Sequence, residues 1–215
     1  MIITAITAHP RKPGRFSLMV DGRELAVLSI EAIERLRLAS GGVVDERLST
    51  EIDREAATLA TYDRALNLLA LRARSTTELR RALVKKGELP ADADAAIARL
   101  VAAGFLDDAS YARQFTRSKG VGGGLSKRRL QQELRRRGVE RDVAEVAIDE
   151  VFVDEEVDEA VEIERVARKK LRTLTRVDLA TRRRRLYAFL ARRGYGSGAI
   201  SRAMHLVSDD VPPDA

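Results

Sequence analysis

Three sets of residues are of types that could do chemistry, but none has the spacing that catalysis requires. The glycine run KGVGGGLSK at residues 119–127 suggests a phosphate loop, yet it lacks Gly-Lys-Ser/Thr in register and a preceding apolar strand. Asp107 and Asp108 could form a carboxylate pair for metal-dependent hydrolysis, but no other acidic motif supports them. His9 and His205 lie in unrelated contexts. We therefore expect no catalytic residue, no metal site, no cofactor and no enzyme.

Structural roles account for these stretches more simply. An Asp that follows an apolar pair and precedes ASYA is typical of a helix N-cap, which is the role we expect for Asp107. We interpret residues 119–127 as a flexible connector before a helix capped by Ser126. Cysteine is absent, which excludes disulfides and thiolate metal sites.

Cationic side chains are the remaining candidates for function. The stretch SKRRLQQELRRRGV at residues 126–139 has basic side chains on both sides of Leu130 and Leu134. The whole chain has 39 Lys and Arg against 33 Asp and Glu, a net charge of +6. A solvated helix would normally mix both signs, whereas residues 126–139 contain six basic residues and one acid, Glu133. This local concentration of positive charge indicates an anionic partner: a nucleic acid, or a protein that handles one. A merely solvated helical face is the competing interpretation.

A degenerate repeat predicts the elements that position these basic residues. The segments ELRRALVKKG, RLQQELRRRG and RLYAFLARRG each end in a glycine, with leucines eight and four residues before it. We expect a helix with a buried i, i+4 leucine pair, stopped by a glycine in the left-handed region. A further helix precedes and another follows each such helix; in the third repeat the middle helix starts near Asp178. The residues that define the repeat are Leu79, Leu83, Gly87, Leu130, Leu134, Gly138, Leu186, Leu190 and Gly194.

The basic residues of the three middle helices alternate with these leucines, so we expect them to project outward and contact the partner. They are Arg80, Arg81, Lys85, Lys127, Arg128, Arg129, Arg135, Arg136, Arg183 and Arg184.

The first residues of the chain follow a different pattern. IITAITA, RFSLMV and RELAVL are short and rich in β-forming residues, and Asp21-Gly22 is a two-residue hairpin signal. Ser29 should cap a short helix that stops at Gly41-Gly42. A long helix should run from Ser49 or Thr50 to about Arg72.

These patterns predict a mainly α protein in which tandem three-helix repeats form an elongated curved array with a small N-terminal β-hairpin or sheet extension. The expected segments are a β-rich extension with one short helix (1–48), three repeats (49–106, 107–153 and 154–207) and a disordered tail (208–215). The first residues do not show a charged region followed by an apolar one, and no run reaches about 18 apolar residues. We expect a cytoplasmic monomer that binds no membrane.

The order of several motifs resembles the RecX family of bacterial recombination regulators. The segments are ALNLLALRARSTTELRRALVKKG, AIARLVAAGFLDDASYARQFTRSK and GLSKRRLQQELRRRGV, and the similarity is strong over residues 62–153 and weak over 154–207. The matching residues are Arg72, Arg74, Ser75, Glu78, Leu79, Arg80, Leu106, Asp107, Asp108, Tyr111, Ala112 and Leu130.

This resemblance implies a regulator in homologous recombination, DNA repair and the SOS response. It would bind the RecA recombinase and its filament on single-stranded DNA, inhibiting ATP hydrolysis, strand exchange and SOS co-protease activity. Some relatives also bind DNA directly. The α-helical repeats would then place Arg128, Arg129, Arg135 and Arg136, with Arg80 and Arg81, on a concave partner-facing side. Filament capping, groove coating and context-dependent support of the recombinase stay open. The alternatives are a plain DNA-binding helical protein and a passive scaffold.

Overall fold

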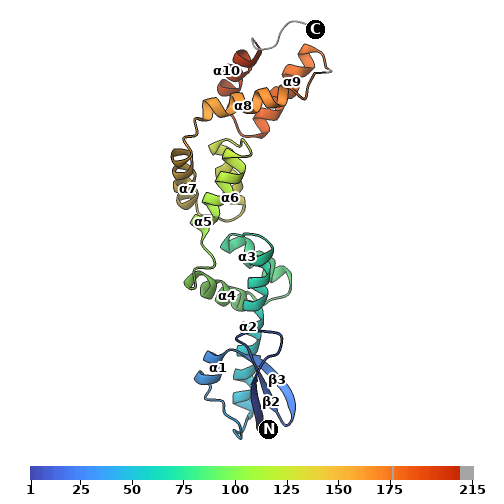
Figure 1. Ribbon diagram of the computed structural model, residues 1–215, viewed down its shortest axis with the longest axis vertical. Helices are drawn as coiled ribbons and strands as arrows, with labels where there is room; N and C mark the ends of the chain where they lie inside the picture. Colours follow the sequence, from blue (N-terminus) through green and yellow to red (C-terminus); the bar gives the residue numbers. More distant parts are fainter. Residues whose placement is uncertain (176, 209–215) are drawn as a thin grey trace. The chain divides into compact units, whose positions relative to one another are not determined.

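The computed structural model describes residues 1–175 and 177–208. The tail that we expected to be disordered lies, apart from Ser208, outside this part of the chain. The protein forms two compact units, Met1–Leu106 and Asp107–Ala215. The described residues are mainly helical, with one small sheet near the N-terminus (Figure 1). This confirms the predicted class of a mainly α protein with an N-terminal sheet.

The N-terminal sheet is antiparallel, with its strands in the order β1-β2-β3. Its strands are β1 (Ile3–Ala8), β2 (Phe16–Val20) and β3 (Arg23–Leu28). Asp21 and Gly22 have φ angles of 48° and 80°, so both central residues of the predicted hairpin turn lie in the left-handed region. Leu18 and Leu28 are fully buried in a core that also contains Ile52 of the long helix.

The helix α1 (Ile30–Arg35) begins after Ser29, as predicted, but it does not extend to Gly41-Gly42. The backbone N–H of Leu38 donates to the carbonyl of Ile33 at 3.0 Å and closes the helix early. Arg37 takes the left-handed conformation, with a φ of 51°, which turns buried Leu38 into the core of the sheet. The apolar residues of IERLRL therefore belong partly to the helix and partly to the turn after it, and the helix ends several residues before the glycines.

The long helix α2 (Glu46–Leu71) ends where predicted and begins earlier than predicted. Its N-cap is Asp45, whose carboxylate accepts the backbone N–H of Leu48 at 2.7 Å, so the expected start at Ser49 or Thr50 is wrong.

Helix α2 belongs to two cores. Ile52 packs with the sheet, whereas Tyr62, Ala65 and Leu68 pack with the leucines of the next helix. The boundary expected between residues 48 and 49 falls inside this helix. The division of the chain into five segments remains our proposal.

Three groups of three helices follow, each with a separate hydrophobic core. They comprise the end of α2 with α3 (Thr76–Lys85) and α4 (Pro90–Ala102); α5 (Asp108–Thr116), α6 (Lys127–Arg136) and α7 (Arg141–Asp154); and α8 (Glu159–Leu171), α9 (Leu179–Arg192) and α10 (Ser197–Ser208) (Figure 1). We call them repeats 1, 2 and 3. The paired leucines of α3, α6 and α9 are all at most 2% exposed, as the repeat predicts.

Each middle helix ends at a left-handed glycine, as predicted. The φ angles are 92° at Gly87, 79° at Gly138 and 92° at Gly194. In each case the residue after the glycine donates its backbone N–H to the carbonyl of the second buried leucine, which satisfies an end of the helix that has no helical partner. Ser75, Ser126 and Asp178 accept backbone N–H groups at the starts of these helices, which confirms the expected cap at Ser126 and the expected helix start near Asp178.

The glycine run is a packed segment, so the expectation of a flexible connector is wrong. A π-helical turn, η1 (Arg117–Val121), continues α5, and the glycines after it contact repeat 3. The Arg193 guanidinium donates to the Gly123 carbonyl, and the Tyr195 hydroxyl donates to the Gly124 carbonyl at 3.3 Å. Burial raises the pKa of the Tyr195 hydroxyl, which keeps it protonated as a donor. A β-carbon at Gly124 would overlap Val166, so this close approach requires glycine.

The junction between repeats 2 and 3 also depends on Gly194, and this can be tested against Gly87. Both have a φ of 92°, but only a β-carbon at Gly194 would meet other atoms, Arg129 Cβ and Ser126 Oγ, each at 2.5 Å. Gly87→Ala should lower the free energy of unfolding by about 1–2 kcal/mol, the cost of the left-handed conformation. Gly194→Ala should lower it by roughly 1–3 kcal/mol more, because the new methyl group overpacks the junction.

Denaturant unfolding followed by circular dichroism measures both effects. Equal destabilisation by the two substitutions would show that the junction does not require the absence of a side chain at position 194.

Candidate functional site

The exposed face of α6 carries the strongest candidate binding surface. Arg128 and Arg135 lie about two helical turns apart on this face. Both are exposed, and neither makes an ion pair with any residue that the structure describes. Together with residues at the start of α7 they line a groove of about 260 Å³. We call it the α6 groove; its lining residues are Arg128, Gln131, Gln132, Arg135, Val139, Arg141 and Ala144.

The α6 groove presents hydrogen-bond donors and positive charge. Guanidinium groups bind phosphate or carboxylate oxygens through paired N–H donors, and the amides of Gln131 and Gln132 can add neutral hydrogen bonds. Arg141 is 3.5 Å from Glu145, so part of its charge is compensated within α7. An anionic surface with spaced acceptor groups is therefore the chemistry that this groove fits.

Other basic residues of α6 are held by acidic neighbours. Lys127 Nζ lies 2.7 Å from Asp149 Oδ1 of α7 and 4.9 Å from the centre of the Phe152 ring. Arg129 pairs with Glu133 at 2.7 Å, and its stem lies against Gly194 of repeat 3.

Arg136 is 3.4 Å from the same Glu133 carboxylate. These contacts give Lys127, Arg129 and Arg136 a structural role that was not predicted from the sequence, where all three were expected to contact the partner.

The basic face of α3 is also partly compensated. Arg80 donates to both carboxylate oxygens of Asp94 on α4, at 2.5 and 3.0 Å. The hydrogen bond from Arg80 lowers the pKa of Asp94 below its ordinary value, so this carboxylate stays ionised at neutral pH. Arg81 and Lys85 are exposed on the same helix.

On α9, Arg183 and Arg184 are exposed and make no ion pair with a described residue. They lie in the unit Asp107–Ala215 together with the α6 groove, whereas the α3 residues belong to Met1–Leu106. Contact of all these residues with one partner, and their location on a concave side, stay predictions.

A second basic cluster, on α8 and at the end of α9, was not among the predicted site residues. Lys169, Lys170 and Arg193 line a pocket with the glycine run. The Lys169-Lys170 pair and the glycine run can both be recognised in the sequence, but no sequence pattern predicts that they lie side by side.

The acidic pair that could have suggested hydrolysis is a helix cap. The Asp107 carboxylate accepts the backbone N–H groups of Ala109 and Ser110, at 3.0 and 3.1 Å. The Ser110 side chain, together with these N–H groups, holds the pKa of Asp107 below its ordinary value. Within residues 1–175 and 177–208 no three His, Cys, Asp or Glu side chains are grouped to hold a metal. No helix in the same part of the chain is long and apolar enough to cross a membrane.

Three successive three-helix groups, each with buried leucines and outward basic residues, define a helical-repeat protein with a cationic surface. Family models match all three groups: RecX, first three-helix domain, at residues 62–100; the second at 107–148; and the third at 158–204. The chain belongs to the RecX family of regulatory proteins, which confirms the resemblance.

Individual relatives and solved structures agree with this membership. The chain is 43% identical over 132 residues to the regulatory protein RecX of Amycolatopsis mediterranei, covering 61% of this chain and 74% of the relative. It is 28% identical over 214 residues to that of Lacticaseibacillus paracasei, covering 99% and 87%. A crystal structure of a regulatory protein RecX has the same fold, with a TM-score of 0.73 at 20% identity, over 95% of this chain and 98% of that one. RecX from Lactobacillus salivarius gives a TM-score of 0.56 at 16% identity, over 71% and 97%.

Two neighbouring arginines on α6 should differ in their effect on stability. Arg128→Ala should change the free energy of unfolding by less than about 0.5 kcal/mol, because Arg128 is exposed and has no partner among the described residues. Arg129→Ala should lower it by about 1 kcal/mol, because its stem packs at the junction and its guanidinium holds Glu133. Denaturant unfolding of both variants measures the difference. If Arg128→Ala is the more damaging change, the assignment of structural and free arginines is wrong.

Proposed function

We propose that this chain regulates the RecA recombinase by binding its filament on single-stranded DNA. Binding would inhibit ATP hydrolysis, strand exchange and SOS co-protease activity, so the protein would act in DNA repair and homologous recombination without being an enzyme. The chain would work as a cytoplasmic monomer. Its membership in a family of regulatory proteins supports this proposal.

The observation that carries the proposal is the α6 groove. Arg128 and Arg135 have no compensating carboxylate among the described residues, although acids are abundant elsewhere on the chain. Leaving two guanidinium groups uncompensated on one face is useful when an anionic partner supplies the missing charge. A filament of recombinase on single-stranded DNA is such a partner, since it combines a phosphate backbone with protein carboxylates.

Repetition supports a filament as the target. A filament presents the same surface many times, and a chain of three repeats can engage more than one copy of it. Linked contacts raise the effective concentration of each further contact, so modest individual interactions can give tight binding. Exposed basic residues on α3, α6 and α9 give every repeat a potential contact.

The same exposed arginines also favour a second candidate function, plain DNA binding without recombinase specificity. Such binding would fall steeply with salt, because each neutralised phosphate releases counterions. It would also occur on naked DNA and show no preference for filaments.

Charge reversal of the α6 groove tests the proposed function. The structure favours Arg128→Glu with Arg135→Glu over a change at Arg129, because Arg129 is part of the junction between repeats. In a titration of RecA's ATPase on single-stranded DNA, the unsubstituted chain should suppress hydrolysis well below one copy per recombinase protomer. The concentration that gives the same suppression should be about tenfold higher or more for the double variant, because the new negative charges repel the anionic partner.

A matched control is Arg23→Glu with Arg54→Glu, which makes the same change in net charge at two exposed positions of the other unit. This control should inhibit like the unsubstituted chain. Equal inhibition by the α6 variant would contradict the proposed interface. No suppression by the unsubstituted chain, with DNA binding in the absence of recombinase, would favour the plain DNA-binding function.

A further inference from the structure

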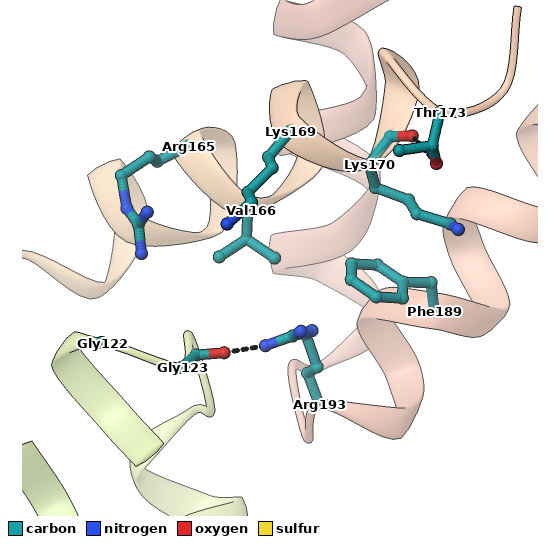
Figure 2. A pocket seen from close by; sticks show the side chains of 9 residues that line it. All are labelled: Gly122, Gly123, Arg165, Val166, Lys169, Lys170, Thr173, Phe189 and Arg193. Carbon is teal, nitrogen blue, oxygen red and sulfur yellow. Dashed lines mark hydrogen bonds between the residues drawn. The ribbon is translucent and has the colours of Figure 1, made fainter. Parts of the chain in front are cut away.

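A basic pocket in the unit Asp107–Ala215 lies apart from the α6 groove. It has a volume of about 300 Å³ and is formed by α8, the end of α9 and the glycines that follow η1. Figure 2 shows the side chains of Arg165, Lys169 and Arg193 around the space that faces Gly122 and Gly123. Lys170 lies beside the Phe189 ring in the same view.

The charges around this pocket are not balanced. Arg165 is compensated by the Glu162 carboxylate, with N–O distances of 2.7 and 2.5 Å. Lys169, Lys170 and Arg193 make no ion pair with any residue in the described part of the chain, and no carboxylate lines the pocket. About three positive charges therefore surround one recess.

Contacts with the aromatic ring and the glycine run hold two of these cations in place. The Lys170 ammonium lies 5.4 Å from the centre of the Phe189 ring, and the Arg193 guanidinium lies 4.5 Å from it. Arg193 also donates to the Gly123 carbonyl. The cation–π contacts stabilise both cations, and the Gly123 carbonyl also stabilises Arg193, without removing either charge. Lys170 and Arg193 thus have contacts that position them without an anion.

The ends of the two helices account for only part of this charge. Lys169 and Lys170 are in the last turn of α8, and Arg193 is the C-cap of α9. A helix C-terminus carries roughly half a negative charge, so two of them offset about one of the three positive charges. About two positive charges remain for a ligand.

We propose that this pocket binds a phosphate group that carries two or more negative charges. A terminal phosphate monoester has a charge of about −1.5 to −2 at pH 7, whereas each phosphodiester of a nucleic-acid backbone has only one. Two sources share this chemistry: the diphosphate of a nucleotide and the 5′-phosphate at the end of a strand. The volume lies at the lower end of the range of small-ligand pockets, about 300–1,000 Å³. The site goes beyond the proposed function, because it requires no recombinase.

Binding at this position would also strengthen the junction between repeats 2 and 3. Arg193 would contact the phosphate while it still holds Gly123, and the lysines of α8 would contact the same phosphate. One ligand would then join the glycine run of repeat 2 to two helices of repeat 3.

The test is a titration of the full chain, without recombinase, followed by the amide resonances of Gly122 and Gly123. The ligands are pyrophosphate, ADP, an oligothymidylate with a 5′-phosphate and the same oligothymidylate with a 5′-hydroxyl. Saturable shifts at these glycines with pyrophosphate or ADP would assign the site to a nucleotide. Shifts with the 5′-phosphorylated strand alone would assign it to a strand end. No saturable shift with any ligand would overturn the proposal. Saturable binding of both oligothymidylates with equal affinity would also overturn it, because that binding would not need a terminal phosphate.

Variants separate the pocket from general attraction between opposite charges. Lys169→Ala with Lys170→Ala should weaken binding of the effective ligand about tenfold or more, and replacement of both by Arg should largely preserve it. The matched control is Arg172→Ala with Arg192→Ala, which removes the same charge at the exposed C-cap of α8 and at an exposed position of α9, both outside the lining. It should weaken binding less than threefold. Equal weakening by the two alanine pairs, with melting curves unchanged, would contradict a specific pocket.

Discussion

The burial of two leucines on each middle helix, closed by a left-handed glycine, is the constraint from which the rest of the structure follows. A fully buried leucine contributes about 1.5–3 kcal/mol relative to an exposed one, so each pair holds its helix firmly against its neighbours. The glycine then lets the chain reverse within two residues and satisfy the last carbonyl groups. With the leucines inside, the remaining positions of α3, α6 and α9 must face outward. The location of the basic residues is therefore a consequence of the packing.

The same constraint shows which features can be read from the sequence. The leucine offsets, the glycines, the cap at Ser126 and the helix start near Asp178 depend on residues close together in the chain, and all are found as predicted. Strand positions and the Asp21-Gly22 turn are local in the same sense. The end of α1 was misplaced because a longer-range core contact decides it.

Features that depend on how helices pack against each other could not be predicted from one sequence. Asp94 and Asp149 compensate basic residues of the preceding helix, so the free arginines on α6 became evident only with α7 in place. The glycine run was interpreted as flexible for the same reason. Its carbonyls accept hydrogen bonds from Arg193 and Tyr195, which lie 70 and 71 positions later in the chain. No local pattern encodes such a partner.

The central claim is that the α6 groove is the surface that meets the recombinase filament. Covalent labelling of arginine side chains, read by mass spectrometry with and without the RecA filament on single-stranded DNA, tests this claim most directly. The account predicts that the filament protects Arg128 and Arg135 from the reagent and leaves Arg23 and Arg54 as reactive as in the free chain. Unchanged labelling of Arg128 and Arg135, at filament concentrations that saturate binding, would contradict it.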